Sequence, residues 1–254
     1  MKKSMLLSTT ITVVVLILAL STATFAWFTV NGSVAVSSST FTAQSGDNLQ
    51  IASATYSTDV KGDSTNVAGY TIGEWGSTYT LNSYSKTFAD ISSADGKAFY
   101  NEDNSSYSGS DGYYTDYFYL SSGAGATLYL TSASAVSATN SSLEQDTLLQ
   151  ESIRIAIYAG DALVMYWAPI TENESLISID SSSTGGTTAT VSASKLQNGA
   201  LVSNFELATY DTTTLQAGVL FTVVIWMEGT DDECVSEAAN GSISVSLGFS
   251  ISST

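Results

Sequence analysis

The chain has 254 residues, with 24 acidic side chains against 7 basic ones, a formal net charge of −17 and no histidine. This charge argues against nucleic acid as a partner, because phosphate backbones repel it, and without histidine the chain has neither an HExxH zinc site nor a Ser-His-Asp set. The length suits one sizeable domain, and the single cysteine excludes an intramolecular disulfide.

Residues 1–26 predict a secretory signal peptide. Lys2 and Lys3 form a basic start, an apolar run covers 11–20, and small residues stand at −3 and −1 of a cut after Ala26. A signal peptidase would then be an early partner, and the new N-terminus would be Trp27. The protein is expected to be secreted, extracellular or at the cell surface.

An uncleaved membrane anchor is the alternative for the same segment. Uncharged residues run from Ser4 past Phe28, which is long enough to span a bilayer. Contact with the membrane is expected only through residues 1–28, before any cleavage. In both cases the bulk of the chain lies outside the cytoplasm.

Residues 27–45 predict a strand that has no hairpin partner nearby. The segment is uncharged, and its valines alternate with small residues. An edge groove on another subunit could accept such a strand through main-chain hydrogen bonds, and the head-to-tail contact would propagate as a filament. The alternatives are a first strand of the protein's own sandwich or a membrane-proximal stalk. The residues expected to act in assembly are Trp27, Phe28, Val30, Val34, Val36 and Phe41.

Residues 46–254 read as strands and turns. In 241–253 the apolar residues at 243, 245, 247, 249 and 251 alternate with Ser or Gly, which is typical of a strand with one buried face, whereas 219–229 is apolar on both faces, as in a central strand. Ile153, Ile155 and Ile157 share one face of a further strand.

Two other segments differ from this pattern. The segment 141–152 predicts a short helix capped by Ser141 or Ser142, and 59–116 predicts long loops and edge strands. The fold expected is an all-β, antiparallel β-sandwich of jelly-roll type with long decorating loops, preceded by an N-terminal hydrophobic helix.

Three segments resemble the TasA and camelysin-like surface proteins of Firmicutes. They are FAWFTVNGSVAV at 25–36, VVIWMEGTDDEC at 223–234 and ISVSLGFSI at 243–251, and the resemblance covers about half of the chain. It implies a secreted jelly roll, a junction cut by a dedicated signal peptidase, and an N-terminal strand donated to the next subunit of an extracellular fibre or biofilm matrix. Camelysin has been called a metalloprotease, but a chain without histidine departs from that activity.

The function expected is therefore a non-enzymatic subunit of a fibre or pilus-like filament. The alternative is a monomeric or anchored adhesin that binds a glycan or protein through tyrosine-rich loops, because aromatic faces stack on sugar rings. A glycoside hydrolase would need a pair of carboxylates in a cleft, for which the sequence offers no motif. The candidate ligand residues are Tyr113, Tyr114, Tyr117 and Tyr119. In an extended segment Tyr117 and Tyr119 share a face, while Phe118 points the other way.

One acidic turn is a candidate calcium site, and no organic cofactor is expected. Its carboxylates follow a strand directly, and calcium prefers oxygen ligands, although acidic turns are also commonly just solvated. The neighbouring Cys234 is expected to be buried, with a free thiol or an intermolecular bridge as alternatives, and Trp226 is expected in the core. The candidate ligands are Asp231, Asp232 and Glu233.

Overall fold

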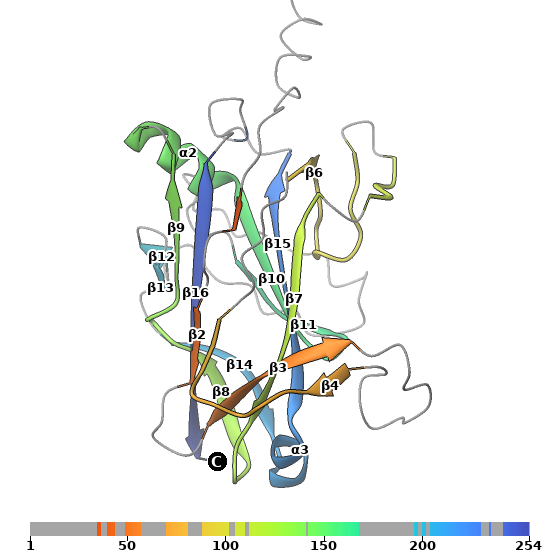
Figure 1. Ribbon diagram of the computed structural model, residues 1–254, viewed down its shortest axis with the longest axis vertical. Coiled ribbons are helices and arrows are strands. Elements are labelled where there is room, and N and C mark those ends of the chain that lie inside the picture. The colour runs from red at the N-terminus through yellow and green to blue at the C-terminus, as the bar shows by residue number, and fades with distance from the viewer. Residues whose placement is uncertain are drawn as a thin grey trace, which may run out of the picture.

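The computed structural model describes residues 35–36, 40–43, 49–56, 70–80, 88–101, 105–109, 112–140, 142–167, 196–197, 200–201, 204–229, 234 and 241–253. In these ranges the chain is mostly β-strand and forms two sheets that pack face to face around a shared apolar core. Figure 1 shows β16 and β9 on one side of the molecule and β15, β7 and β10 on the other. The expected all-β sandwich architecture is confirmed.

The first sheet, here called the β16 sheet, has nine strands among the described residues. Its members in spatial order are β12 (Leu196–Gln197), β13 (Ala200–Leu201), β9 (Ala135–Thr139), β16 (Ser242–Ser253), β2 (Thr40–Ala43) and β5 (Thr78–Thr80), with β1 (Ala35–Val36), β8 (Ala126–Leu130) and β14 (Phe205–Tyr210) attached beside this row.

The second sheet, the β15 sheet, has seven strands in the described ranges. Its members in spatial order are β11 (Ala162–Trp167), β10 (Ile153–Ala159), β15 (Val219–Glu228), β7 (Tyr114–Ser121), β3 (Gln50–Tyr56) and β4 (Tyr70–Ile72), with β6 (Asp90–Ile91) beside β15.

The sandwich is not wholly antiparallel, which corrects the prediction. Strands β1 and β2 run parallel to β16, and β6 runs parallel to β15. Parallel neighbours cannot be joined by a tight hairpin, so each of these pairs brings together segments that are distant in the sequence. Local patterns therefore could not reveal them.

The last strand, β16, is the spine of its sheet. Its apolar residues at 243, 245, 247 and 249 are fully buried in the core, as the alternating pattern predicts. Its first half pairs with β9 and its second half with β8. Strands β8 and β9 therefore lie end to end along one side of this single long strand.

The strands β10 and β15 are buried on both faces. Ile153, Ile155 and Ile157 lie in the core between the sheets, as expected, while Ala156 and Tyr158 on the opposite face belong to a second apolar cluster. A strand reads as apolar throughout when both of its faces are covered, and this accounts for the pattern at 219–228.

Two short helices border the sandwich in the described part of the chain. Helix α2 (Leu143–Ser152) begins where the sequence predicts, and the Ser142 hydroxyl accepts a hydrogen bond from the Gln145 amide at 3.3 Å. Helix α3 (Thr212–Ala217) was not predicted, although Asp211 caps it and Gly218 follows it at a φ of 92°. With six residues it is too short to show a helical period.

Two groups of side chains cover the outer face of the β15 sheet, one towards each end. Ile91 and Phe99 pack on Trp226 at one end, and Tyr70 and Trp75 form the group at the other. Figure 1 shows β6 at the first end and β4 at the second. Between the two groups a strip of the sheet lies open as a groove, described below.

Within the ranges given above, no helix has the length and apolar character needed to cross a membrane. The predicted N-terminal helix and the segment 1–26 lie outside those ranges.

Candidate functional site

The described part of the predicted assembly segment lies in the protein's own β16 sheet. Strand β2 is inserted between β16 and β5, with Phe41 in register with Leu247 on one side and with Tyr79 on the other. Strand β1 pairs with the start of β16, with Val36 opposite Ile243. In the single chain this segment therefore serves as a strand of its own sandwich.

Phe41 is the residue of β2 that reaches deepest into the core. Its side chain is 0 % exposed, and its ring lies 5.0 Å from that of Phe118, which belongs to the opposite sheet. The rings of Tyr79 and Phe249 lie 6.1 and 6.2 Å away, both in edge-to-face arrangements. Such aromatic pairs add stabilisation beyond the burial of area, so Phe41 adds a specific contact to the main-chain pairing of β2 with β16 and β5.

A partly buried carboxylate links the two sheets beside this cluster. The Tyr79 hydroxyl, from β5, donates to the two carboxylate oxygens of Asp116, from β7, at 3.3 and 3.1 Å. The Tyr114 hydroxyl donates to the same carboxylate at 3.0 Å, and the Tyr117 amide donates at 2.7 Å. Burial raises the pKa of Asp116, against the lowering effect of these hydrogen bonds, and burial also raises the pKa of Tyr79.

Replacing Asp116 by asparagine should change how stability depends on pH. Because the pKa of Asp116 is raised on folding, its stabilisation is complete below the ordinary aspartate pKa of about 3.9 and is lost as pH rises through the folded value. Asp116→Asn has no proton to lose. The wild type should therefore lose stability relative to Asp116→Asn as the pH rises from the ordinary aspartate pKa through the raised one. Urea titrations between pH 3 and 8 measure the free energy of unfolding of both proteins, and the value for the variant minus the value for the wild type should increase with pH. A difference that falls with pH would contradict this account.

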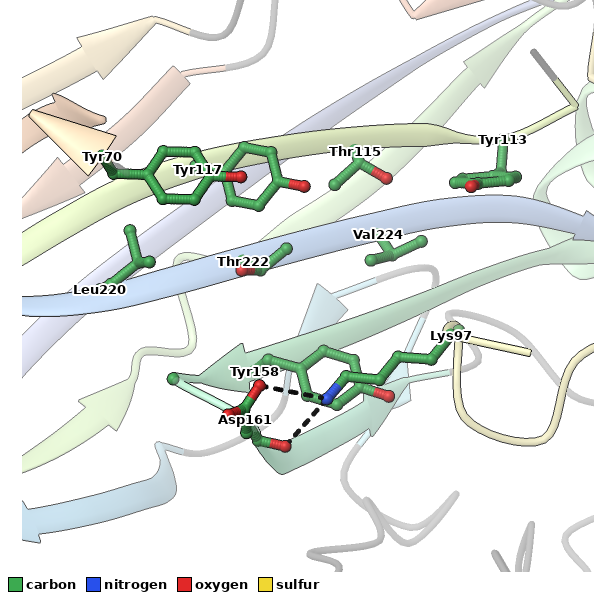
Figure 2. Close-up of a pocket in the computed structure, with 12 residues that line it drawn as sticks. Tyr70, Lys97, Tyr113, Thr115, Tyr117, Tyr158, Asp161, Leu220, Thr222 and Val224 are labelled. Carbon is green, nitrogen blue, oxygen red and sulfur yellow. Dashed lines mark hydrogen bonds and ion pairs between the residues drawn. The ribbon is translucent and has the colours of Figure 1, made fainter. Parts of the chain in front are cut away.

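The second candidate site is the groove on the outer face of the β15 sheet (Figure 2), which has a cavity volume of about 310 Å³. Three neighbouring strands form its centre, where Tyr117 of β7, Thr222 of β15 and Tyr158 of β10 are directly paired. Neighbouring strands lie about 4.8 Å apart, so the two tyrosine backbones are separated by about 10 Å with the threonine between them. One side of the groove is aromatic, the other is a lysine that lies over a buried tyrosine ring, and the floor between them mixes polar and apolar side chains.

Tyr70 and Tyr117 make one side of the groove. Their ring centroids are 4.5 Å apart at an interplanar angle of 35°. Figure 2 shows the two rings next to each other over β7 with their faces turned to the viewer. Tyr70 comes from β4, so the pair joins two strands that are distant in the sequence.

Lys97 and Tyr158 make the other side. The lysine ammonium lies 4.3 Å from the centroid of the Tyr158 ring and donates to the Asp161 carbonyl at 3.0 Å, with the Asp161 carboxylate at 3.9 Å. The Tyr158 hydroxyl donates to the Asp95 carbonyl, and burial, followed by the charge of Asp95, raises the pKa of Tyr158. This tyrosine is therefore a neutral structural support for the lysine.

The four tyrosines predicted as a ligand platform do not all lie together. Tyr113 and Tyr117 line the groove, and Tyr119 lies on the same face beneath Tyr70. Tyr114 points the opposite way, into the core between the sheets, because adjacent residues of a strand face opposite sides. These residues lie on or beside the central strand β7, which corrects the expectation of tyrosine-rich loops.

Sequence reasoning missed the second side of the groove. Lys97 and Asp161 are 64 residues apart, and neither stands in a pattern that predicts their contact. The alternation of Tyr113, Thr115 and Tyr117 was the one available signal, because it places three polar or aromatic side chains on one face of a strand.

The remaining predicted residues divide into two sets. Cys234 is 2 % exposed in the core and Trp226 is fully buried, both as expected. Among the described residues, no group of three or more possible metal ligands comes together. The cleavage site, most of the assembly residues and the acidic turn lie outside the described residues: Ala26, Trp27, Phe28, Val30, Val34, Asp231, Asp232 and Glu233.

Comparisons of the chain with known protein families, with curated proteins and with solved structures found no match.

Proposed function

We propose that the chain is a secreted, non-enzymatic structural subunit of an extracellular fibre, pilus-like filament or biofilm matrix. Residues 1–26 direct export and are removed between Ala26 and Trp27, and the domain that follows has jelly-roll topology. Subunits join when the N-terminal segment of one chain takes the place of β1 and β2 in the next. The hydrophobic N-terminal helix is part of the proposal as the export signal.

The observation that carries this proposal is the burial of Phe41 on a strand near the N-terminus. The Phe41 ring packs against the rings of Phe118, Phe249 and Tyr79 in the core. None of these three residues belongs to β1 or β2. The same contacts form whichever copy of the chain supplies the strand. Exchange of an identical element between copies is therefore a low-cost route to assembly.

The connectivity of β2 favours exchange. The next strand, β3, belongs to the opposite sheet, so no tight hairpin fastens β2 to a neighbour in its own sheet. Its partner on one side, β16, is the last strand of the chain and runs parallel to it. The stretch between Ala43 and Leu49 is the one connection from β2 to the rest of the domain on its C-terminal side. This connection therefore adds little to the free-energy cost of moving β2 out from between β16 and β5.

Strand exchange of this kind would make a filament. The donated strand and the accepting groove are different surfaces, so the contact is head-to-tail and propagates unless a ring closes. Main-chain hydrogen bonds would supply affinity, and alternate side chains would fix the register. Trp27 and Phe28 are proposed to add to the interface as large aromatic anchors.

The proposal is tested by electron microscopy of two proteins, one beginning at Trp27 and one beginning at Ala35. The shorter protein keeps β1 and β2 but lacks the residues before them. We expect fibres from the first and folded monomers from the second, because strand exchange needs the leading aromatic residues whereas the protein's own sheet does not.

Matched point variants complete this test. Trp27→Ala with Phe28→Ala should reduce assembly to the level of the shorter protein, while Thr24→Ala in the full chain lies before the junction and should leave fibres unchanged after cleavage. Folded monomers from the protein that begins at Trp27, under all conditions of concentration, would refute the proposal.

A further inference from the structure

We infer that the groove between Tyr117 and Lys97 is a binding site for an uncharged oligosaccharide. This inference does not rest on the fibre proposal, because the groove lies on the β15 sheet whereas β1 and β2 belong to the β16 sheet. A fibre subunit and an anchored adhesin could both carry it. Four features of the groove support this class of ligand.

The first feature is the aromatic platform. Tyr70 and Tyr117 present neighbouring ring faces, and both side chains are only partly buried although they pack on an apolar cluster. Two tyrosines held in contact lose little further conformational freedom when a ligand binds, since each has few rotatable bonds. The apolar face of a sugar ring can stack on such a surface, as aromatic side chains combine an apolar body with a polar tip.

The second feature is a fixed polar side. The Ser93 hydroxyl accepts from the Gly96 amide at 2.8 Å, and the Asp95 carboxylate accepts from the Lys97 amide at 2.8 Å. Gly96 has a φ of 78°, and a Cβ there would lie 2.8 Å from the Ala156 side chain. This tight turn sits directly on β10, so the lysine is positioned before any ligand arrives. Preorganisation of this kind reduces the entropic cost of binding.

The third feature is the set of hydroxyl groups that face the groove. Thr115 and Thr222 line its floor, and Tyr117 lies beside them. Within the described part of the chain, none of these three side-chain hydroxyls takes part in a hydrogen bond. Sugar hydroxyls both donate and accept, and they match this mixed set of groups.

The fourth feature is charge. Lys97 is paired with Asp161 at the groove's edge, so this pair contributes no net charge there. The chain as a whole carries a net charge of −17, and its field would repel an acidic polysaccharide. The chemistry therefore favours a neutral sugar chain over an anionic one.

The dimensions agree with a short length of polysaccharide. The volume of about 310 Å³ is at the lower end of the roughly 300–1,000 Å³ of small-ligand sites. Figure 2 shows the platform, Thr115 and Tyr113 in a row along β7, with Leu220, Thr222 and Val224 in a parallel row along β15. We place the sugar chain along the strand direction, between these rows and the lysine.

The test is a titration of the full-length chain, kept in solution by a detergent that has no sugar headgroup. The probes are uncharged hexasaccharides of β-1,4-glucose, β-1,3-glucose, α-1,4-glucose and β-1,4-N-acetylglucosamine, with a hexagalacturonate as the anionic control. Amide NMR shifts report binding. We expect saturable shifts at β7, β10 and β15 with at least one neutral probe and none with the anionic one.

Matched variants locate the site. Tyr117→Ala removes half of the platform and should weaken binding at least tenfold, while Thr222→Val keeps the shape, removes one hydroxyl and should weaken it about threefold. The control is Tyr129→Ala, which makes the same change on β8 of the other sheet, where the side chain is also partly buried. It should leave binding unchanged. If Tyr117→Ala fails to fold, Thr222→Val and Lys97→Met decide the question.

Three results would overturn the inference. They are the absence of binding by every neutral probe at millimolar concentration, binding of the anionic hexagalacturonate, and equal losses in Tyr117→Ala and Tyr129→Ala. None of these results depends on whether the protein forms fibres.

Discussion

Replacing Phe41 by alanine is expected to lower the free energy of unfolding by about 3–5 kcal/mol, the range for large aromatic residues removed from a core. The side chain is fully buried and meets rings from β5, β7 and β16. Its removal leaves a cavity between the two sheets. Strands of both sheets would have to move to fill it. Urea unfolding, followed by tryptophan fluorescence at concentrations below assembly, measures the change.

The neighbouring residue gives the control for this prediction. Thr42 lies on the same strand with its side chain on the opposite, partly exposed face, and Thr42→Ala should cost less than about 1 kcal/mol. An equal loss for both variants would mean that β2 is held by its main chain alone. A small effect of Phe41→Ala would remove the physical basis on which the strand is thought to recognise its groove.

Replacing Trp226 by alanine should lower the free energy of unfolding by a comparable amount, about 3–5 kcal/mol. This residue belongs to the apolar cluster on the outer face of the β15 sheet. The indole is fully buried on the outer side of β15, with the rings of Phe99 and Tyr166 at 5.7 and 5.6 Å, edge to face. Its ring nitrogen donates to the Glu228 carboxylate at 3.0 Å. The loss would combine a cavity with a weakened buried polar contact.

This substitution should also loosen one side of the groove. The turn that holds Lys97 packs on Trp226 through Gly96, so amide hydrogen exchange at 93–98 should become faster in Trp226→Ala. Trp75→Ala is the matched control, because Trp75 is only partly buried in the group at the other end of the sheet. Protection at 93–98 that is equal in both variants would contradict the proposed support of the lysine.

The strands of this protein could be predicted from its sequence, because side chains on a strand alternate between its two faces. The alternation at 243–249 and at 153–157 assigns residues to the correct faces. A period of two identifies a face but not a partner strand. The parallel pairing of β2 with β16 joins segments about 200 residues apart, and no local pattern encodes it.

The candidate site was predictable to a smaller extent. The tyrosines at 117 and 119 share a face as their spacing requires, whereas Tyr114 is buried on the other side of the strand. The opposing side depends on Lys97 and Asp161, which meet only because β10 and the turn at 93–98 are packed together. Long-range packing of this kind leaves no signature in a single sequence.

The aspartate between the sheets was missed for a similar reason. Asp116 stands among polar and aromatic residues that suggested an exposed loop, and its partner Tyr79 lies on an edge strand of the opposite sheet. A carboxylate that is largely removed from water is tolerated when hydrogen bonds satisfy it, and three donor groups do so for the partly buried Asp116. Only the tertiary structure brings them together.

The most direct test of strand exchange is a pair of cysteines across β1 and β16. Ala35 and Ser242 are paired residues of these strands, and neighbouring strands are about 4.8 Å apart, within reach of a disulfide. The substitutions Ala35→Cys and Ser242→Cys would be made together with Cys234→Ala, in the protein that begins at Trp27. Fibres would then be grown under reducing conditions, oxidised, and separated on a denaturing gel without reductant. The account predicts a ladder of covalent multimers, because the strand comes from the next subunit. Fibres that dissolve into monomers with internal disulfides would show that each chain keeps its own strand, and would contradict the central claim.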